Sequence, residues 1–151
     1  MATPKFILEL REKIGHDLLW LTGITGVVLN EHAEVLLVRR ADTGRWSLVA
    51  GILEPGEQPA LGLAREIHEE TAVEVAIERL VSVEALPPSS YPNGDQVQFL
   101  DLCFRCRPLR GEPHVNDDES LDVRWWPVDA LPDGLEDEMV TLIRRARERL
   151  G

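Results

Sequence analysis

Residues 51–73 read GILEPGEQPALGLAREIHEETAV, and this stretch divides into a loop and a helix. The first part, residues 51–58, holds two glycines, a proline and two glutamates, a composition typical of a loop. From Pro59 onward Ala, Leu, Arg and Glu dominate, and proline is tolerated in the first turn of a helix. The sequence therefore predicts a loop that leads directly into a helix over Pro59–Thr71.

The predicted helix carries three glutamates close together. Glu66, Glu69 and Glu70 stand at i, i+3 and i+4, which places them within an arc of roughly 100°. A separate face gathers the residues expected to pack on a sheet, namely Ala60, Leu63, Ala64, Ile67 and Thr71. Because neighbouring like charges weaken a helix, a bound divalent cation is the simplest compensation, and Mg²⁺ prefers oxygen ligands. Taken alone, the triplet also fits a solvated acidic face without a metal.

The three glutamates belong to a longer pattern of spaced residues that begins at Gly51. Gly51 is followed after five residues by Glu57, and after seven more by the segment REIHEETAV at 65–73. With hydrophobic positions filled by Ile67 and Val73, the stretch resembles the Nudix box, the signature of the Nudix hydrolase superfamily. The resemblance implies an α+β fold of the Nudix type, an α/β/α sandwich with a mixed β-sheet between helices.

Looser similarity extends the resemblance over residues 20–145. Leu36–Arg40 and Gly44–Leu48 are similar to the strand and the Trp-bearing segment that precede the box. Ala72 stands where the family usually has glycine, and alanine costs roughly 1–2 kcal/mol if the backbone there is left-handed. Residues 48–51 read LVAG where the family often has LPGG, and the following EPGE is similar to members that act on dinucleotides.

The resemblance also implies roles for individual residues. The implied ligands of Mg²⁺ or Mn²⁺ are Glu66, Glu70, Glu69, Glu57 and the carbonyl oxygen of Gly51. The implied catalytic residues are Glu69, Arg65 and Glu119. Arg65 could orient a carboxylate through a bidentate contact. Asp118 is an alternative to Glu119 and Glu69 as general base, and the loop at 116–119 could instead be a solvated acidic turn.

Five residues outside the box are candidate substrate contacts. Arg39 and Arg40 end a predicted strand and could face phosphate or form a surface pair. Trp46 could stack on a base or pack in the core. Tyr91 and Asn93 lie in a loop with three prolines, where an exposed aromatic ring could serve as a platform for a nucleobase.

The composition limits the classes of partner. The chain has 27 acidic and 16 basic residues, a formal net charge of -11, which argues against binding to duplex nucleic acid or an anionic membrane surface. No apolar run approaches the ~20 residues that span a bilayer, and charges interrupt any signal peptide, so a cytoplasmic protein is expected. Cys103 and Cys106 stand three apart on a predicted strand and point to opposite faces, which argues against a zinc or redox site.

The remaining pattern predicts a single domain over residues 1–151, with residues 1–17 as an N-terminal helical extension. Helices are expected at 4–15 and 135–150. Strands are expected at 18–21, 24–29, 35–39, 46–50, 76–86, 96–107 and 123–126. The polar turn at 30–33 would join the second and third strands as a hairpin, and 87–93 is expected to be a loop.

The resemblance implies a metal-dependent pyrophosphohydrolase that cleaves the diphosphate of a nucleoside diphosphate linked to another group, as in ADP-ribose or a nucleotide sugar. The alternatives are a nucleoside triphosphate pyrophosphohydrolase, a non-catalytic nucleotide-sensing module, and an unrelated α+β domain with a solvated acidic helix. The implied partner is a small-molecule nucleotide, and a homodimer stays open because dimers are common in the family.

Overall fold

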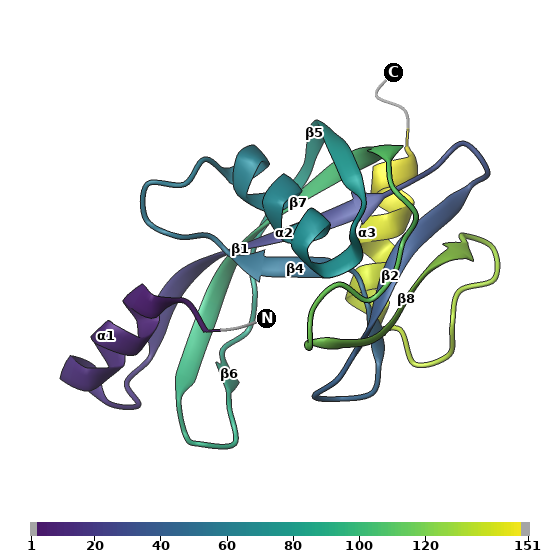
Figure 1. The fold of residues 1–151 in the computed structure, drawn as a ribbon. Coiled ribbons are helices and arrows are strands. Elements are labelled where there is room, and N and C mark those ends of the chain that lie inside the picture. Colours follow the sequence, from purple (N-terminus) through teal and green to yellow (C-terminus); the bar gives the residue numbers. More distant parts are fainter. Residues whose placement is uncertain (1–2, 149–151) are drawn as a thin grey trace.

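Two β-sheets form the middle layer of the computed structural model, which describes residues 3–148 (Figure 1). The larger sheet has the order β4-β1-β7-β5, with β6 paired to β7. Its strands are β1 (Leu19–Val28), β4 (Val49–Ile52), β5 (Glu74–Ala85), β6 (Ser89–Ser90) and β7 (Gln96–Arg110). The smaller sheet has the order β3-β2-β8, with strands β2 (Glu34–Arg40), β3 (Trp46–Ser47) and β8 (Ser120–Pro127). β1 and β7 run parallel, so the larger sheet is mixed.

Alternation along β2 shows how the layers are stacked. Leu36 and Val38 belong to the apolar cluster that includes α2 (Pro59–Thr71), whereas Val35 and Leu37 belong to the cluster that includes α3 (Asp137–Arg147). Because successive residues of a strand point to opposite faces, α2 and α3 cover opposite sides of the strands. The expected α/β/α sandwich is confirmed.

The two cysteines of β7 follow the same alternation. Both are free and buried, with Cys103 in the cluster under α3 and Cys106 in the cluster under α2. Burial raises the pKa of each thiol to about 12. The prediction of opposite faces is confirmed, and the thiols act as small apolar core groups.

The helices lie close to their predicted positions. α2 matches the predicted range, the first helix, α1, spans Lys5–Ile14, and α3 occupies the middle of the range expected near the C-terminus. The last residues of that range, 149–150, lie outside the described part of the chain. α1 is anchored by Ile7, which packs with Leu21, Ile52 and Val97.

Several strand predictions were wrong. The hairpin expected around residues 30–33 does not form, because β1 and β2 belong to different sheets and are joined by one antiparallel bridge, Leu29–Val35. The strand expected at 46–50 is divided between β3 and β4, one in each sheet. The expected runs at 18–21 and 24–29 form one strand, and β6 lies inside the loop expected at 87–93. Apolar patterns mark strands, but they do not select pairing partners when both faces are buried.

Ala72 ends α2 in a left-handed conformation, with φ 65° and ψ 10°. Its N–H donates to the carbonyl oxygen of His68 at 2.9 Å. The conformation confirms the geometry considered from the sequence, in which alanine takes a position that favours glycine.

We expect the substitution Ala72→Gly to stabilise the protein by about 1 kcal/mol, because glycine adopts this conformation without a Cβ penalty. The measurement is the free energy of unfolding in urea. Ala64→Gly, inside the same helix, is the matched control and should destabilise by up to about 1 kcal/mol. Equal losses in both variants would contradict the prediction.

Candidate metal and active site

Glu70 lies on the buried side of α2, with 5% of its surface exposed, whereas Glu69 is exposed. The sequence predicted that Glu66, Glu69 and Glu70 share one arc of the helix, but it did not predict that Glu70 would be buried. Glu70 follows Leu63 by seven residues and Ile67 by three, a spacing that places it at the border of the apolar face. Helical position alone could therefore have separated Glu70 from Glu69.

The segment between β7 and β8 is held on the C-terminal end of α2. The backbone N–H of His114 donates to the carbonyl oxygen of Thr71, and the Asn116 side-chain amide donates to that of His68, each at 3.1 Å. Gly111, with φ +98°, permits the close approach, since a Cβ there would lie 2.4 Å from the carbonyl oxygen of Ala72. The His114 N–H thus satisfies the Thr71 carbonyl group, which the helix end leaves without an intrahelical partner, and Asn116 adds a second donor to the His68 carbonyl group.

This docking brings three carboxyl groups together at the end of α2. One oxygen atom from each of Glu70, Asp117 and Glu119 lies within 4.8 Å of the others. Glu119 was predicted as a site residue, whereas Asp117 was not, and the alternative base Asp118 is exposed. Asp117 and Glu119 lie in a bend just before β8, where the Glu119 N–H donates to Asp117 Oδ1 at 3.1 Å. The acidic run at 117–119 beside the predicted base candidates was the available sequence signal for Asp117.

The surroundings of these acids disfavour their charged forms. Burial, and then the neighbouring charge of Glu66, raises the pKa of Glu70 from its ordinary value of 4.5 to about 7. Burial is also the largest cause that raises the pKa of Glu66 and of Asp117. Several acids with raised pKa values in one place are the pattern that a bound cation relieves.

Gly51 and Glu66, both predicted from the resemblance as metal ligands, are in contact. A Cβ at Gly51 would lie 2.9 Å from the carboxyl carbon of Glu66. The absent side chain leaves the space that the Glu66 carboxylate occupies beside β4. Since the charge of Glu66 helps to raise the pKa of Glu70, this carboxylate extends the acidic cluster.

Arg65 organises the other predicted glutamates. Its Nε donates to Glu57 Oε2 at 3.0 Å and its Nη1 donates to Glu69 Oε2 at 3.1 Å. Nη1 also lies 3.6 Å from Glu66 Oε1. Arg65 was expected to orient one carboxylate, and it lies close to three. One guanidinium thereby links the loop at 51–58, through Glu57, to the helix α2, through Glu66 and Glu69.

Two hollows meet at Glu119. The larger, about 520 Å³, lies over the acidic end of α2 and is lined by Ile52, Glu66, Glu69, Asp117 and Glu119, among others. The smaller, about 220 Å³, lies on the other side and is lined by Arg40, Ser47, Leu48, Glu70 and Glu119, among others. Glu119 therefore lies between a hollow lined mostly by acidic residues and a smaller hollow whose wall includes the cation Arg40.

Arg40 supplies a cation to the smaller hollow. Its guanidinium is paired with Asp42 through Nε and Nη2, at 2.9 and 2.6 Å. The hydrogen bond to Asp42 is the largest cause that raises the pKa of Arg40, and the charge of Glu70 acts in the same direction. Tyr91, another predicted substrate residue, has an exposed side chain and lines neither hollow.

The other predicted substrate residues have partners within the protein. Trp46 packs edge to face on Trp126, with ring centroids 5.1 Å apart, and Arg124 lies over both rings. Arg39 Nε donates to the carbonyl oxygen of Gly44 at 2.9 Å, and the Asn93 side-chain amide donates to Asp95 at 3.2 Å. The structure brings Arg40, but not Trp46, to the wall of a hollow.

Comparison with known proteins identifies the family to which the chain belongs. A family model described as the NUDIX domain matches residues 20–147. A MutT-like protein of Streptomyces ambofaciens is 37% identical over 109 residues, which cover 72% of this chain and 65% of that protein. The 8-oxo-dGDP phosphatase NUDT18 of Homo sapiens is 37% identical over 115 residues, covering 72% of this chain and 33% of that protein. The chain belongs to the Nudix family.

The fold itself is shared with solved structures. A MutT NUDIX hydrolase from Burkholderia pseudomallei superimposes with a TM-score of 0.68 at 23% identity, covering 84% of this chain and 98% of that chain. The chain spans about a third to two-thirds of the length of the two curated relatives above. Among residues 3–148, no helix is long and apolar enough to cross a membrane.

We expect Glu70 to make the metal-free protein less stable as the pH rises from about 4.5 to about 7. In this window folded Glu70 holds a proton that the unfolded chain releases, so its stabilising contribution is present at lower pH and lost above its folded pKa. The measurement is the free energy of unfolding with a chelator at several pH values. Glu70→Gln should lose this pH-dependent component, whereas the exposed control Glu12→Gln should keep it. Identical pH profiles for wild type and Glu70→Gln would contradict the prediction.

Proposed function

We propose that the protein is a divalent-metal-dependent hydrolase of phosphoric anhydride bonds, acting on a nucleoside diphosphate linked to another group. The observation that carries the proposal is the cluster of Glu70, Asp117 and Glu119 at the junction of the two hollows. A diphosphate placed at this junction would have space for a substituent on either side. Human NUDT18, a relative by sequence, is described as an 8-oxo-dGDP phosphatase, which supports a nucleotide that contains a diphosphate as the substrate.

The donor set fits Mg²⁺ or Mn²⁺. The grouped atoms are carboxylate oxygens, which hard cations prefer, and the raised pKa of Glu70 indicates that a positive charge would be favourable there. We assign Glu70, Glu66 and Asp117 as the residues that would hold the metal, with Glu119 beside them. Glu57 and Glu69 add negative charge around this metal site, and the Gly51 carbonyl group adds a further oxygen atom. When bound, the cation would neutralise phosphate charge and lower the pKa of a coordinated water.

Three other side chains, those of Arg65, Arg40 and Glu119, would have separate roles in binding and catalysis. Arg65 keeps Glu57 and Glu69 in fixed positions through the contacts described above. Arg40 faces the smaller hollow and would attract a phosphate or hold its charge during cleavage. We assign Glu119 as the general base, because it lines both hollows and so stands where a water and a diphosphate would meet. Glu69 is the second candidate, and one of its oxygens accepts a hydrogen bond from Arg65.

The first test is the set of products from a panel of ADP-ribose, nucleotide sugars, dinucleotides and nucleoside triphosphates with Mg²⁺. Cleavage within the diphosphate should yield a nucleoside monophosphate and a phosphorylated second group. Release of inorganic pyrophosphate from triphosphates would favour the alternative hydrolase. Nucleotide binding without turnover of any compound would favour the sensing module instead.

The second test removes one ligand. Glu70→Gln should lower kcat by at least about 100-fold and weaken Mg²⁺ binding, because a metal ion supplies several kcal/mol of charge stabilisation. Glu112→Gln, in the same segment as Asp117 but outside the cluster, is the matched control and should retain activity and Mg²⁺ binding. Calorimetric titrations that do not differ between wild type and Glu70→Gln would overturn the metal site.

A further inference from the structure

Gly62 lies inside α2, at a position where glycine is unfavourable for a helix. Its N–H donates to the carbonyl oxygen of Gln58 at 2.9 Å, so it takes part in the helical hydrogen bonding. After proline, glycine is the residue that a helix interior tolerates least, because it loses the most backbone freedom on folding. Its φ is not positive, so no left-handed turn requires glycine there. The reason for glycine at this position lies in what surrounds it.

The side chain of Glu57 lies directly over Gly62. A Cβ at Gly62 would lie 2.7 Å from both Cδ and Oε1 of Glu57, and 3.0 Å from its Cγ. These distances are well inside van der Waals contact, which is about 3.5–4.0 Å between carbon atoms. Gly62 is buried although it shares a helix face with the charged residues Arg65 and Glu66. The Glu57 carboxylate therefore occupies the space that a missing side chain leaves on the helix.

In this position both oxygen atoms of the Glu57 carboxylate have donors. Oε2 accepts from Arg65 Nε at 3.0 Å and lies 2.9 Å from Arg65 Nη2, so two nitrogen atoms of one guanidinium approach it. Oε1 accepts from the backbone N–H of Glu54 at 3.3 Å. The Glu57 side chain is 19% exposed, so these contacts are largely shielded from water. Glu57 thus joins the loop at 51–58 to α2 at one fixed point.

The same guanidinium reaches two glutamates of the proposed metal site. Nη1 of Arg65 donates to Glu69 Oε2 at 3.1 Å and lies 3.6 Å from Oε1 of Glu66, which is assigned to the metal. Because a guanidinium is planar and rigid, the atoms that bind Glu57 also fix the direction of Nη1. A displaced Glu57 would therefore change how Arg65 meets these two glutamates.

We propose that Gly62 is a positioning residue for the metal site. Its bare backbone seats the Glu57 carboxylate, and this carboxylate fixes the plane of Arg65. From that plane Arg65 contacts Glu66 and Glu69. Glycine is required here, despite its poor helix propensity, because any side chain would displace Glu57. The positioning of Arg65 is a property of the protein alone, whereas its effect on turnover rests on the proposed function.

The first test follows the Arg65 Nε–H group by NMR spectroscopy in protein treated with a chelator. Loss of one signal in Arg65→Lys identifies this group. Gly62→Ala should shift or broaden the signal, because its acceptor on Glu57 has moved, and Glu57→Gln should do the same. Leu61→Ala removes a side chain that is 72% exposed in the same turn, and this matched control should leave the signal in place. An unchanged signal in Gly62→Ala would overturn the proposal.

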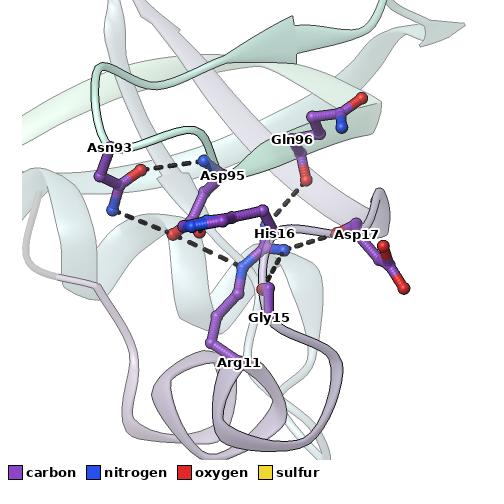
Figure 2. A network of polar contacts seen from close by, with 7 residues as sticks. All are labelled: Arg11, Gly15, His16, Asp17, Asn93, Asp95 and Gln96. Atoms are coloured by element: carbon purple, nitrogen blue, oxygen red, sulfur yellow. Dashed lines mark hydrogen bonds and ion pairs between the residues drawn. The ribbon is translucent and has the colours of Figure 1, made fainter.

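Arg11 provides an internal reference in the same spectrum (Figure 2). Its guanidinium is held in another part of the fold, where Nη2 donates to the carbonyl oxygen of Gln96 at 2.7 Å and Nη1 to that of Gly15 at 3.0 Å. Arg11→Lys identifies its Nε–H signal. Since the seat of Glu57 does not involve these residues, the reference signal should stay in place in Gly62→Ala. Movement of both signals would mean a general rearrangement and would contradict a specific role for Gly62.

Unfolding in urea separates positioning from damage to the helix. In the Glu57→Ala background, Gly62→Ala should raise the urea midpoint, because alanine favours a helix and no carboxylate then lies over position 62. In wild type the same substitution should give a smaller rise or a fall, since the Cβ displaces Glu57. Equal rises in both backgrounds would refute the seat. If Gly62→Ala does not fold by itself, it should fold in the Glu57→Ala background, and failure there counts equally against the proposal.

The effect on the metal site is measured with the best substrate of the panel. Gly62→Ala should lower kcat about tenfold, the loss expected for one displaced hydrogen bond between charged groups, and should weaken Mg²⁺ binding in calorimetry. Leu61→Ala should match wild type. The double variant Glu57→Ala, Gly62→Ala should turn over no more slowly than Glu57→Ala alone, because both changes act through one carboxylate. Additive losses, or unchanged kcat and Mg²⁺ affinity in Gly62→Ala, would show that Gly62 has no such role.

The two proposals fail in different ways. If wild type neither binds Mg²⁺ nor cleaves any compound of the panel, the proposed function fails. The NMR signals and urea midpoints then still decide whether Gly62 positions Glu57 and Arg65, since neither measurement requires a metal or a substrate. If wild type is active but Gly62→Ala changes neither the Arg65 signal nor kcat, only the role of Gly62 is overturned.

Discussion

The docking of residues 111–119 on the C-terminal end of α2 is the interaction on which the site depends. The Thr71 carbonyl group at the helix end accepts from the backbone of His114, and the His68 carbonyl group, already bonded to the Ala72 N–H, also accepts from the side chain of Asn116. These hydrogen bonds place Asp117 and Glu119 against Glu70. Without them the three acids would repel one another and separate, because each carries or gains negative charge in a partly buried place.

The same arrangement explains how so acidic a chain could hold a phosphate substrate. Burial makes the charged forms of Glu70, Glu66 and Asp117 less favourable. A cation bound beside these three side chains would stabilise their charged forms. Arg65 partly balances the charge of the surrounding glutamates Glu57 and Glu69 by pairing with them. The cation, not the protein surface as a whole, would then meet the negative charge of the substrate.

Much of the fold and part of the candidate site could be predicted from the sequence. The periodicity after Pro59 gave α2 with the correct ends, and the spacing of three residues between the cysteines gave their opposite faces. The prediction of a hairpin between β1 and β2 was wrong. Both strands are buried on two faces, and an apolar pattern does not identify the strand with which each one pairs. Asp117 and the burial of Glu70 were missed, since both depend on what packs against the end of α2.

By itself, the sequence determined the Nudix box, the helix that carries its glutamates and the excess of acid, because these are local spacings and sums over residues. Only the tertiary structure decided that Glu70 joins Asp117 and Glu119, that Trp46 packs on Trp126, and that Arg11 reaches the start of β7. The physical reason is that such contacts join residues far apart in the chain. They are selected by which hydrogen-bonding groups and apolar faces remain to be satisfied once the local elements have formed.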